Sequence, residues 1–269
     1  MLRPSIIHAL VTRQVLLYTR NPVRGIELFF WPIVQLLLWG FVTLFLQKQA
    51  GVGADGFQRF ITFLIGAIIL WDALFRSQQG VAISFLEDVW TRNLLNVFAA
   101  PIHMTEYLAA SFAVGFLRVV ITALAMAAIA AAAYSFQLFQ FEWMLIAFYG
   151  NLMMFGWTLG VVATALVLRW GHGAESMAWA IPFMIQPFAC VFYGADVLPD
   201  WMRVVAMAMP PAHVFEGMRA LLATGEIHPS GLFAAAGLNV LYMAAAGALF
   251  ARTLRAARER GLLVKTASS

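Results

Sequence analysis

The sequence is dominated by six apolar stretches, each of a length that crosses a lipid bilayer as a helix. They lie at about 26–46, 58–79, 106–134, 142–168, 176–194 and 231–251. A spanning helix needs roughly 20 apolar residues to cross the hydrocarbon core. Of the 269 residues, 62% are hydrophobic and only 11% are charged, a balance that no water-soluble domain of this size requires. The sequence therefore predicts an all-α membrane protein that forms a single transmembrane domain over residues 1–269.

The basic residues lie mainly at one set of ends of these stretches. If both termini, the 80–105 loop and the 169–176 turn are cytoplasmic, eleven Lys and Arg residues lie inside and four lie outside. Cytoplasmic loops of membrane proteins carry such an excess of positive charge. The pattern therefore predicts that both termini are cytoplasmic and that residues 252–269 form a basic tail. A nucleic-acid site would instead gather basic residues on one folded face, and we expect no nucleic-acid partner.

Residues 5–20, which precede the first stretch, have the pattern of a helix that lies on the membrane surface. Apolar side chains such as Ile7, Leu10 and Leu17 recur on one side, and polar ones on the other. This two-sided pattern is typical of an interfacial helix in contact with lipid. We expect the helix to end at Asn21, because the residue before a proline is disfavoured in the helical conformation.

The segment 84–101, between the second and third stretches, predicts a short amphipathic helix. Phe85, Leu86 and Val89 belong to an apolar face, whereas Glu87 and Asp88 mark a polar face together with Thr91 and Arg92. Such a helix can dock into a groove of a soluble partner. A helix that merely lies on the membrane would show the same pattern, so both interpretations remain open.

The segment 186–225 is too apolar for an ordinary loop and too often interrupted by proline for a spanning helix. Non-helical backbone at membrane depth occurs only where protein covers it or where it lines a cavity. A pair of short re-entrant helices in the outer leaflet fits these constraints. A long interfacial loop is the alternative.

Three charged residues, Asp72, Arg76 and Arg118, fall inside the apolar stretches. A charge in the bilayer is costly, so these side chains are expected to face protein or water. Asp72 and Arg76 are four residues apart and can pair along one helix. A purely structural pairing and a role along a transport path are both compatible with the sequence. Gly156 and Gly160 form a GxxxG pattern that permits close helix packing.

The sequence contains no recognisable catalytic, metal-binding or phosphate-binding motif. Its five histidines show no metal-ligand spacing, and no GxxxxGK[ST] loop is present. We therefore expect neither an enzyme nor a chain that binds a cofactor or metal itself. Two other functions remain open. An intramembrane lipid-modifying enzyme would rely on His213 and Glu216, which lie three apart, and a secondary transporter would be expected to show internal repeats.

Several short motifs follow one another in a characteristic order. Arg20-Asn-Pro is followed by Phe30-Trp-Pro, then by the segment from Glu87 to Pro101, and then by Tyr193-Gly, Leu198-Pro-Asp-Trp, Pro210-Pro and Glu216-Gly-Met-Arg219. With this order the chain resembles the membrane subunit, or permease, of the type-two exporter class of ATP-binding-cassette (ABC) transporters. The resemblance covers nearly the whole chain. The coupling region differs from a Gly-Thr-Leu-Glu-like stretch common in that family, which leaves the substrate open.

The resemblance implies a homodimer in the bacterial cytoplasmic (inner) membrane that exports a substrate with the help of a separate ATP-binding subunit. That subunit, and not this chain, would hold ATP and Mg²⁺. The resemblance also implies roles for individual residues. A coupling helix that contacts the ATP-binding subunit would include Glu87, Asp88, Trp90, Arg92, Asn93 and Leu94. Arg13, Arg20 and Arg24 would belong to the gate and interfacial helix, and Pro199, Trp201, Pro210, Glu216 and Arg219 to the re-entrant hairpin.

Overall fold

The computed structural model describes residues 2–50, 54–134, 136–225 and 229–259, which form helices and connecting turns with no strand. The α-helices are α1 (Pro4–Thr19), α2 (Pro22–Ala50), α3 (Ala54–Trp90), α4 (Leu94–Ala99), α5 (Met104–Tyr134), α6 (Met144–Trp170), α7 (Glu175–Ile185), α8 (Asp200–Met207), α9 (Pro210–Thr224) and α10 (Pro229–Glu259). Short 3-10 turns lie at Leu138–Phe141, Gly171–Ala174, Gln186–Phe188 and Ala195–Val197. The all-α class predicted from the sequence is confirmed.

Five helices in the described part of the chain are long and apolar enough to cross a membrane. These spans are Pro22–Leu46, Phe60–Trp90, Met104–Tyr134, Met144–Trp170 and Pro229–Glu259. They coincide with five of the six predicted stretches, although the second continues well beyond the expected end at residue 79. The chain is thus an integral membrane protein.

The expected spanning helix at 176–194 is not confirmed. Helix α7 has only 11 residues, and a 3-10 turn at Gln186–Phe188 follows it. Residues 175–188 would rise about 21 Å as a regular helix, less than the roughly 30 Å of hydrocarbon in a bilayer. Prolines at 182 and 187 each remove a backbone donor from the helical ladder. Cys190 then has a φ of 54°, which takes the chain out of helical geometry.

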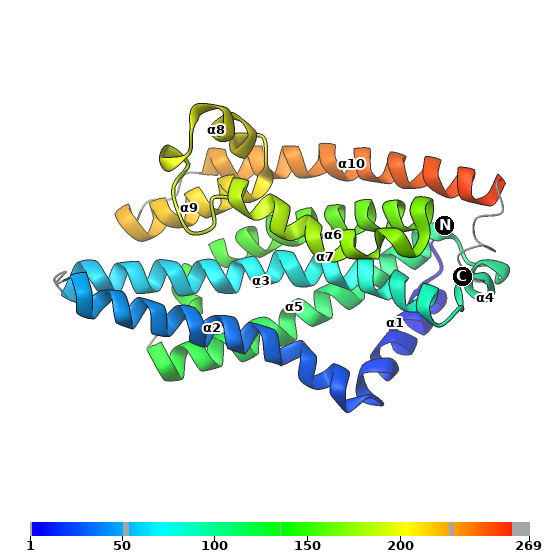
Figure 1. Cartoon of the computed structure of the whole chain (residues 1–269), viewed down its shortest axis with the longest axis horizontal. Helices are drawn as coiled ribbons and strands as arrows, with labels where there is room; N and C mark the ends of the chain where they lie inside the picture. The colour runs from blue at the N-terminus through cyan, green and yellow to red at the C-terminus, as the bar shows by residue number, and fades with distance from the viewer. Residues whose placement is uncertain (1, 51–53, 135, 226–228, 260–269) are drawn as a thin grey trace.

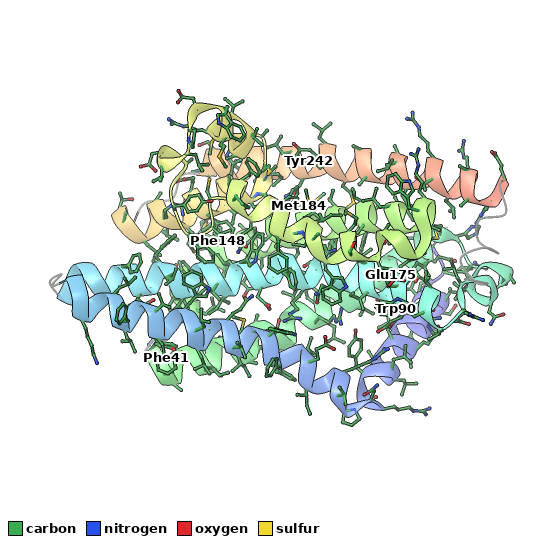
Figure 2. All side chains as sticks on the ribbon, viewed as in Figure 1. Phe41, Trp90, Phe148, Glu175, Met184 and Tyr242 are labelled. Carbon is green, nitrogen blue, oxygen red and sulfur yellow. The ribbon has the colours of Figure 1, made fainter. Side chains whose placement is uncertain are left out.

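The long helices run side by side, with α3 in the middle of the bundle (Figure 1). Helix α3 packs most extensively against α6 and α5, and α6 in turn packs against α10. Within the most apolar 18-residue stretch of each span, 78% of the α3 stretch and 72% of the α6 stretch is buried inside the protein. The corresponding shares are only 22% for α2 and 17% for α10. Helices α3 and α6 therefore form the core, while α2 and α10 present apolar side chains outward. Figure 2 shows this contrast between Phe148, which is fully buried, and Phe41, which is 64% exposed.

Glycines allow the backbones of the core helices to approach closely. A Cβ atom at Gly156 would lie 2.4 Å from the carbonyl oxygen of Leu74, and one at Gly160 would lie 2.6 Å from Cβ of Val81. On the α5 side, a Cβ at Gly80 would lie 2.3 Å from Cα of Gly115. The GxxxG pattern noted in the sequence therefore lies at the contact between α6 and α3, where larger residues would push the two helices apart.

The two ends of the bundle differ. Helices α1 and α4 and the C-terminal end of α10 lie at one end, and α8 and α9 lie at the opposite end (Figure 1). Helix α1 begins with Pro4 at its first position, where a missing N–H costs nothing. It ends just before Asn21-Pro22, as the sequence predicts, and it packs against α5 and the start of α2.

Candidate functional site

The end of the bundle near α1 contains buried carboxylates paired with arginines from the N-terminal region. Arg24 Nη1 lies 2.6 Å from Glu87 Oε1, and Arg13 Nη2 lies 2.8 Å from Asp88 Oδ2. The hydroxyl of Tyr107 donates a second hydrogen bond of 2.8 Å to Asp88 Oδ2. Both carboxylates belong to the last turns of α3, while the arginines come from α1 and the first turn of α2. These pairs join the N-terminal region to the core helix.

A third pair joins the very start of α1 to α5. Glu106 is fully buried and accepts hydrogen bonds from Arg3 Nε at 2.8 Å and Arg3 Nη2 at 2.9 Å. It also accepts from the backbone N–H groups of Arg3 and His103, at 3.0 and 2.9 Å. Its bond to His103 closes the first turn of α5 in the manner of a capping box. We call the three ion pairs Arg3–Glu106, Arg13–Asp88 and Arg24–Glu87 the N-terminal clamp.

The polar face predicted at Glu87 and Asp88 lies buried in this structure. Their residues are only 4% and 3% exposed, because α1 and α2 cover that side of α3. The expected single amphipathic helix over 84–101 is also divided. Helix α3 continues to Trp90, Arg92 has a φ of 54°, and α4 begins at Leu94. An unbroken helix is ruled out because one left-handed residue interrupts the helical ladder.

The remaining predicted partner contacts differ in their exposure. Trp90 is 44% exposed, and Arg92 is exposed beside it. Asn93 is half-buried and donates a hydrogen bond of 3.2 Å to Asp88 Oδ1, while Leu94 is 2% exposed and packs into the core. The surface that this turn offers to another molecule therefore consists mainly of Trp90 and Arg92.

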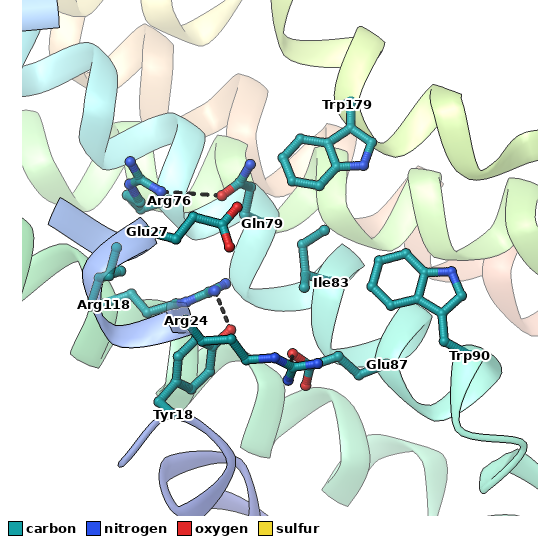
Figure 3. Close-up of a pocket in the computed structure, with 11 residues that line it drawn as sticks. Tyr18, Arg24, Glu27, Arg76, Gln79, Ile83, Glu87, Trp90, Arg118 and Trp179 are labelled. Carbon is teal, nitrogen blue, oxygen red and sulfur yellow. Dashed lines mark hydrogen bonds and ion pairs between the residues drawn. The ribbon is translucent and has the colours of Figure 1, made fainter. Parts of the chain in front are cut away.

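A pocket of about 220 Å³ lies next to the clamp, between α1, α2, α3, α5 and α7 (Figure 3). It is lined by Tyr18, Arg24, Glu27, Leu28, Arg76, Gln79, Ile83, Glu87, Trp90, Arg118 and Trp179. We call this cavity the polar pocket. Its lining includes charged and aromatic side chains, and the Arg24–Glu87 pair of the clamp forms part of its wall.

The three intramembrane charges predicted from the sequence meet at or beside the polar pocket. Arg76 Nε lies 3.2 Å from Asp72 Oδ1, and both residues are 4% exposed, so the predicted pairing is confirmed. Arg76 Nη1 also donates to Gln79 Oε1 at 3.3 Å. The guanidinium of Arg118 instead donates to the hydroxyl of Tyr18 and lies 4.7 Å from the centre of its ring. Arg118 thus has a neutral partner where Arg76 has a carboxylate.

Tyr18 remains a neutral hydrogen-bond partner at physiological pH. Burial raises the pKa of its phenol above the ordinary value, because desolvation disfavours the phenolate; the positive charge of Arg118 opposes that shift only in part. Its hydroxyl therefore accepts from Arg118 without supplying a negative charge.

Comparison with known protein families decides what kind of protein carries this site. The family model described as "ABC-2 type transporter" matches residues 6–223, which is most of the chain. The chain belongs to the ABC-2 type transporter family. A search of curated proteins gave no significant match. The protein is thus the membrane permease of an ABC transporter, a class that implies an ATP-binding partner, and the resemblance drawn from its motifs is confirmed.

The polar pocket of this ABC-2 permease lies within the matched residues, as do the Arg13–Asp88 and Arg24–Glu87 pairs of the clamp, whereas Arg3 precedes the match. Helix α8 and all of α9 except its last residue, at the opposite end, are also matched. Pro199 precedes α8 and Pro210 begins α9, so the prolines mark helix starts. Glu216 Oε1 lies 2.9 Å from Arg219 Nη2 and accepts from the backbone N–H of Ala195 at 2.7 Å. These bonds tie α9 to the turn that follows α7. Trp201 remains 65% exposed.

The clamp residues of α1 and α2 were predictable from the sequence only in part. Arg13 and Arg24 belong to the clamp, but Arg20, which was predicted with them, is exposed at the end of α1. Arg3, which pairs with Glu106 across 103 positions, was not predicted. Tyr18 and the pocket residues Gln79 and Trp179 were not predicted either. No local pattern distinguishes these residues, because their partners lie on other helices.

The pair suggested for an intramembrane enzyme is engaged elsewhere in this ABC-2 permease. His213 Nε2 lies 2.8 Å from the carbonyl oxygen of Met207, and Glu216 pairs with Arg219. Within the described residues, no cluster of three or more His, Cys, Asp or Glu side chains could hold a metal ion. The geometry therefore gives no support to a reaction centre at this pair.

Proposed function

We propose that this chain is the permease of an ABC exporter in the bacterial cytoplasmic membrane, where it works as a homodimer with a separate ATP-binding subunit. In this proposal both termini and the α4 end are cytoplasmic, and α7 with its 3-10 turn serves as a short fifth span of a six-span layout. Helices α8 and α9 form the re-entrant pair on the outer side. The substrate leaves the cytoplasm, and the partner subunit binds ATP and Mg²⁺.

One observation supports the proposal: a single helix joins the exposed turn at Trp90 and Arg92, which we propose as the docking surface, to the centre of the bundle. Helix α3 has 37 residues, and a regular helix of that length extends about 55 Å. Trp90 and Arg92 lie exposed at its end, while Arg76 lines the polar pocket on the same helix. A force applied at Trp90 would therefore act directly on the pocket, because an α-helix moves as a rigid body over several turns.

The N-terminal clamp supports a role for α1 and the start of α2 as a gate. These elements lie over the same end of α3 and are held by two ion pairs to α3 and one to α5. The arginines of these pairs are partly accessible to solvent. A movement of Glu87 and Asp88 would therefore pull Arg24 and Arg13 with it. Two arrangements of the clamp, each favoured by a different nucleotide state of the partner, would provide alternating access.

The experiment that tests the proposal is co-purification of an ATPase with the tagged full-length chain from gently solubilised membranes. We expect a soluble ATPase in equal stoichiometry with the permease. Trp90→Ala and Arg92→Glu should reduce its recovery, since both side chains lie on the proposed docking surface. Arg203→Glu on α8, at the opposite end of the bundle, is the matched control and should recover the ATPase normally (Figure 1).

A permease that purifies intact and alone would contradict the proposal, as would equal losses in the Arg92→Glu and Arg203→Glu variants. A secondary transporter or a lipid-modifying enzyme would then need direct assay. Neither alternative is favoured by an observation in this structure, because His213 and Glu216 have structural partners.

A further inference from the structure

Arg118 differs from the other arginines of the polar pocket in how its charge is compensated. Arg24 pairs with Glu87 at 2.6 Å, and Arg76 pairs with Asp72 at 3.2 Å. Arg118 has no carboxylate within ion-pair distance among the described residues, and its one hydrogen-bond partner is the neutral hydroxyl of Tyr18. Its Nε and Nη1 atoms are buried and have no hydrogen-bond partner. A guanidinium with two buried, unused donors is energetically expensive.

The unused donors belong to a side chain that lines an open cavity. Figure 3 shows Arg118 on the wall of the polar pocket, opposite Ile83 and Trp179. An arginine presents its donors in a planar fork that matches the oxygens of a phosphate or carboxylate. An anion in the pocket would therefore lie beside a guanidinium that has no carboxylate within ion-pair distance among the described residues.

The remaining lining of the pocket favours an anion attached to an apolar group. Leu28, Ile83, Trp90 and Trp179 provide apolar and aromatic walls beside Arg118. The cavity of about 220 Å³ is larger than one small ion requires. It also lies among helices whose outer faces are apolar, so a molecule with a hydrocarbon chain can approach from the membrane.

Glu27 is the one carboxylate of the lining without an ion pair among the described residues, and it would repel an anion. Its residue is exposed, whereas Arg118 is partly buried, so solvent weakens the field of Glu27 inside the pocket more than that of Arg118. The field of the cation therefore outweighs that of the exposed carboxylate. Removal of the Glu27 charge should therefore strengthen anion binding, whereas removal of the Arg118 charge should weaken it.

The geometry points to a specific ligand class for the polar pocket: an amphipathic molecule whose anionic headgroup, a phosphate or carboxylate, binds the guanidinium of Arg118. The apolar part of the molecule lies against Trp179 and Ile83. The inference rests on the proposed transport function, for which it names the substrate class. Its test measures binding alone, without ATP or the partner subunit, so its failure is distinguishable from a failure of the proposed function.

The test uses the purified full-length chain in dodecyl maltoside micelles that contain an increasing mole fraction of dodecyl phosphate. The melting temperature of the wild-type protein should rise and saturate, because a ligand that binds the folded state stabilises it. The Arg118→Gln variant should need a mole fraction of dodecyl phosphate about tenfold higher to reach the same rise in melting temperature. A change of this size corresponds to the loss of roughly one charge-assisted hydrogen bond. Glu27→Gln should require less dodecyl phosphate than the wild type, and Arg203→Gln on α8 should match the wild type.

Two further probes separate the sources of the anion. Inorganic phosphate at the same concentrations should leave the melting temperature unchanged. The cationic detergent dodecyltrimethylammonium should not raise the melting temperature, because Arg118 does not bind a cationic headgroup. If inorganic phosphate saturates the effect as well as dodecyl phosphate does, the amphipathic part of the inference is overturned. Equal responses of Arg118→Gln and the wild type would overturn the site itself.

Folding of the key variant is checked in the absence of ligand. Arg118→Gln removes a cation that has no ion-pair partner among the described residues and two buried donors without hydrogen bonds. Its melting temperature without dodecyl phosphate should therefore be no lower than that of the wild type. Trp179→Ala provides a second variant that leaves Arg118 in place. It should weaken the response to dodecyl phosphate, and an unchanged response would contradict the assigned position of the apolar chain.

Discussion

Arg24 and Glu87, which are 63 positions apart in the chain, form an ion pair of 2.6 Å that joins the start of α2 to the end of α3. The side chain of Glu87 is 5% exposed and that of Arg24 is 32% exposed. The second carboxylate oxygen of Glu87 is buried without a hydrogen-bond partner. Arg24 therefore supplies the main compensation for a buried negative charge, and the pair holds the first span against the core.

Arg24→Ala should lower the free energy of unfolding by about 1–3 kcal/mol, because it leaves Glu87 buried and unpaired. The double variant Arg24→Ala/Glu87→Gln should lose less, since no charge then remains uncompensated. Chemical denaturation of the detergent-solubilised protein measures both values. Arg20→Ala is the matched control, because Arg20 is exposed on the same segment. An equal effect of Arg20→Ala and Arg24→Ala would contradict the importance of the pair.

The buried pair of Asp72 and Arg76 predicts that the stability of the folded protein depends strongly on keeping both charges or neither. Asp72→Asn leaves the Arg76 guanidinium in a buried environment without its carboxylate, and we expect a loss of about 3 kcal/mol. The double variant Asp72→Asn/Arg76→Gln should recover most of this loss, because it removes both charges. A double-mutant cycle by thermal denaturation measures the coupling. Additive effects of the two single variants would show that the pairing contributes nothing.

The contact between α6 and α3 predicts a large difference between two glycines on one helix. Gly156→Ala would place Cβ 2.4 Å from the Leu74 carbonyl oxygen, whereas Cβ at Gly150 would meet no atom within 4 Å. Gly156→Ala should therefore destabilise the protein by about 1–3 kcal/mol through overpacking. Gly150→Ala should be neutral or slightly stabilising, since alanine is the better helix former. Melting temperatures of the two variants, compared side by side, decide the point; similar values would contradict this packing.

The Arg3–Glu106 pair predicts that α1 can be released from the bundle by one substitution. Glu106→Gln removes the charge that accepts from Arg3 and the N–H of His103, and should lower the stability of the folded protein, because these donors lose a charged acceptor. Hydrogen exchange in residues 4–19 should then increase markedly, because this pair joins the start of α1 to α5. Glu142→Gln, which changes an exposed carboxylate, is the control. Unchanged protection of α1 in the Glu106→Gln variant would show that other contacts hold this helix.

Local features of the sequence determined the helical membrane architecture. The five long spans follow from apolar runs that exceed the thickness of a bilayer, and Pro22 marks the boundary between α1 and α2 because proline restricts the residue before it. The Asp72–Arg76 pairing was predictable for the same reason, since residues four apart meet on one helix face. The prolines at 182 and 187 shorten the fifth apolar stretch, although its hydropathy alone suggested a full span.

Only the tertiary structure decided which polar side chains are buried and with what partners. Glu87 and Asp88 have the sequence pattern of an exposed helix face, yet α1 and α2 cover them and supply Arg24 and Arg13. An amphipathic pattern shows that a helix has a polar face but not whether water or another helix lies against it. The polar pocket and the unpaired donors of Arg118 likewise arise from side chains on five helices. Their positions depend on how those helices pack, which no local stretch of sequence records.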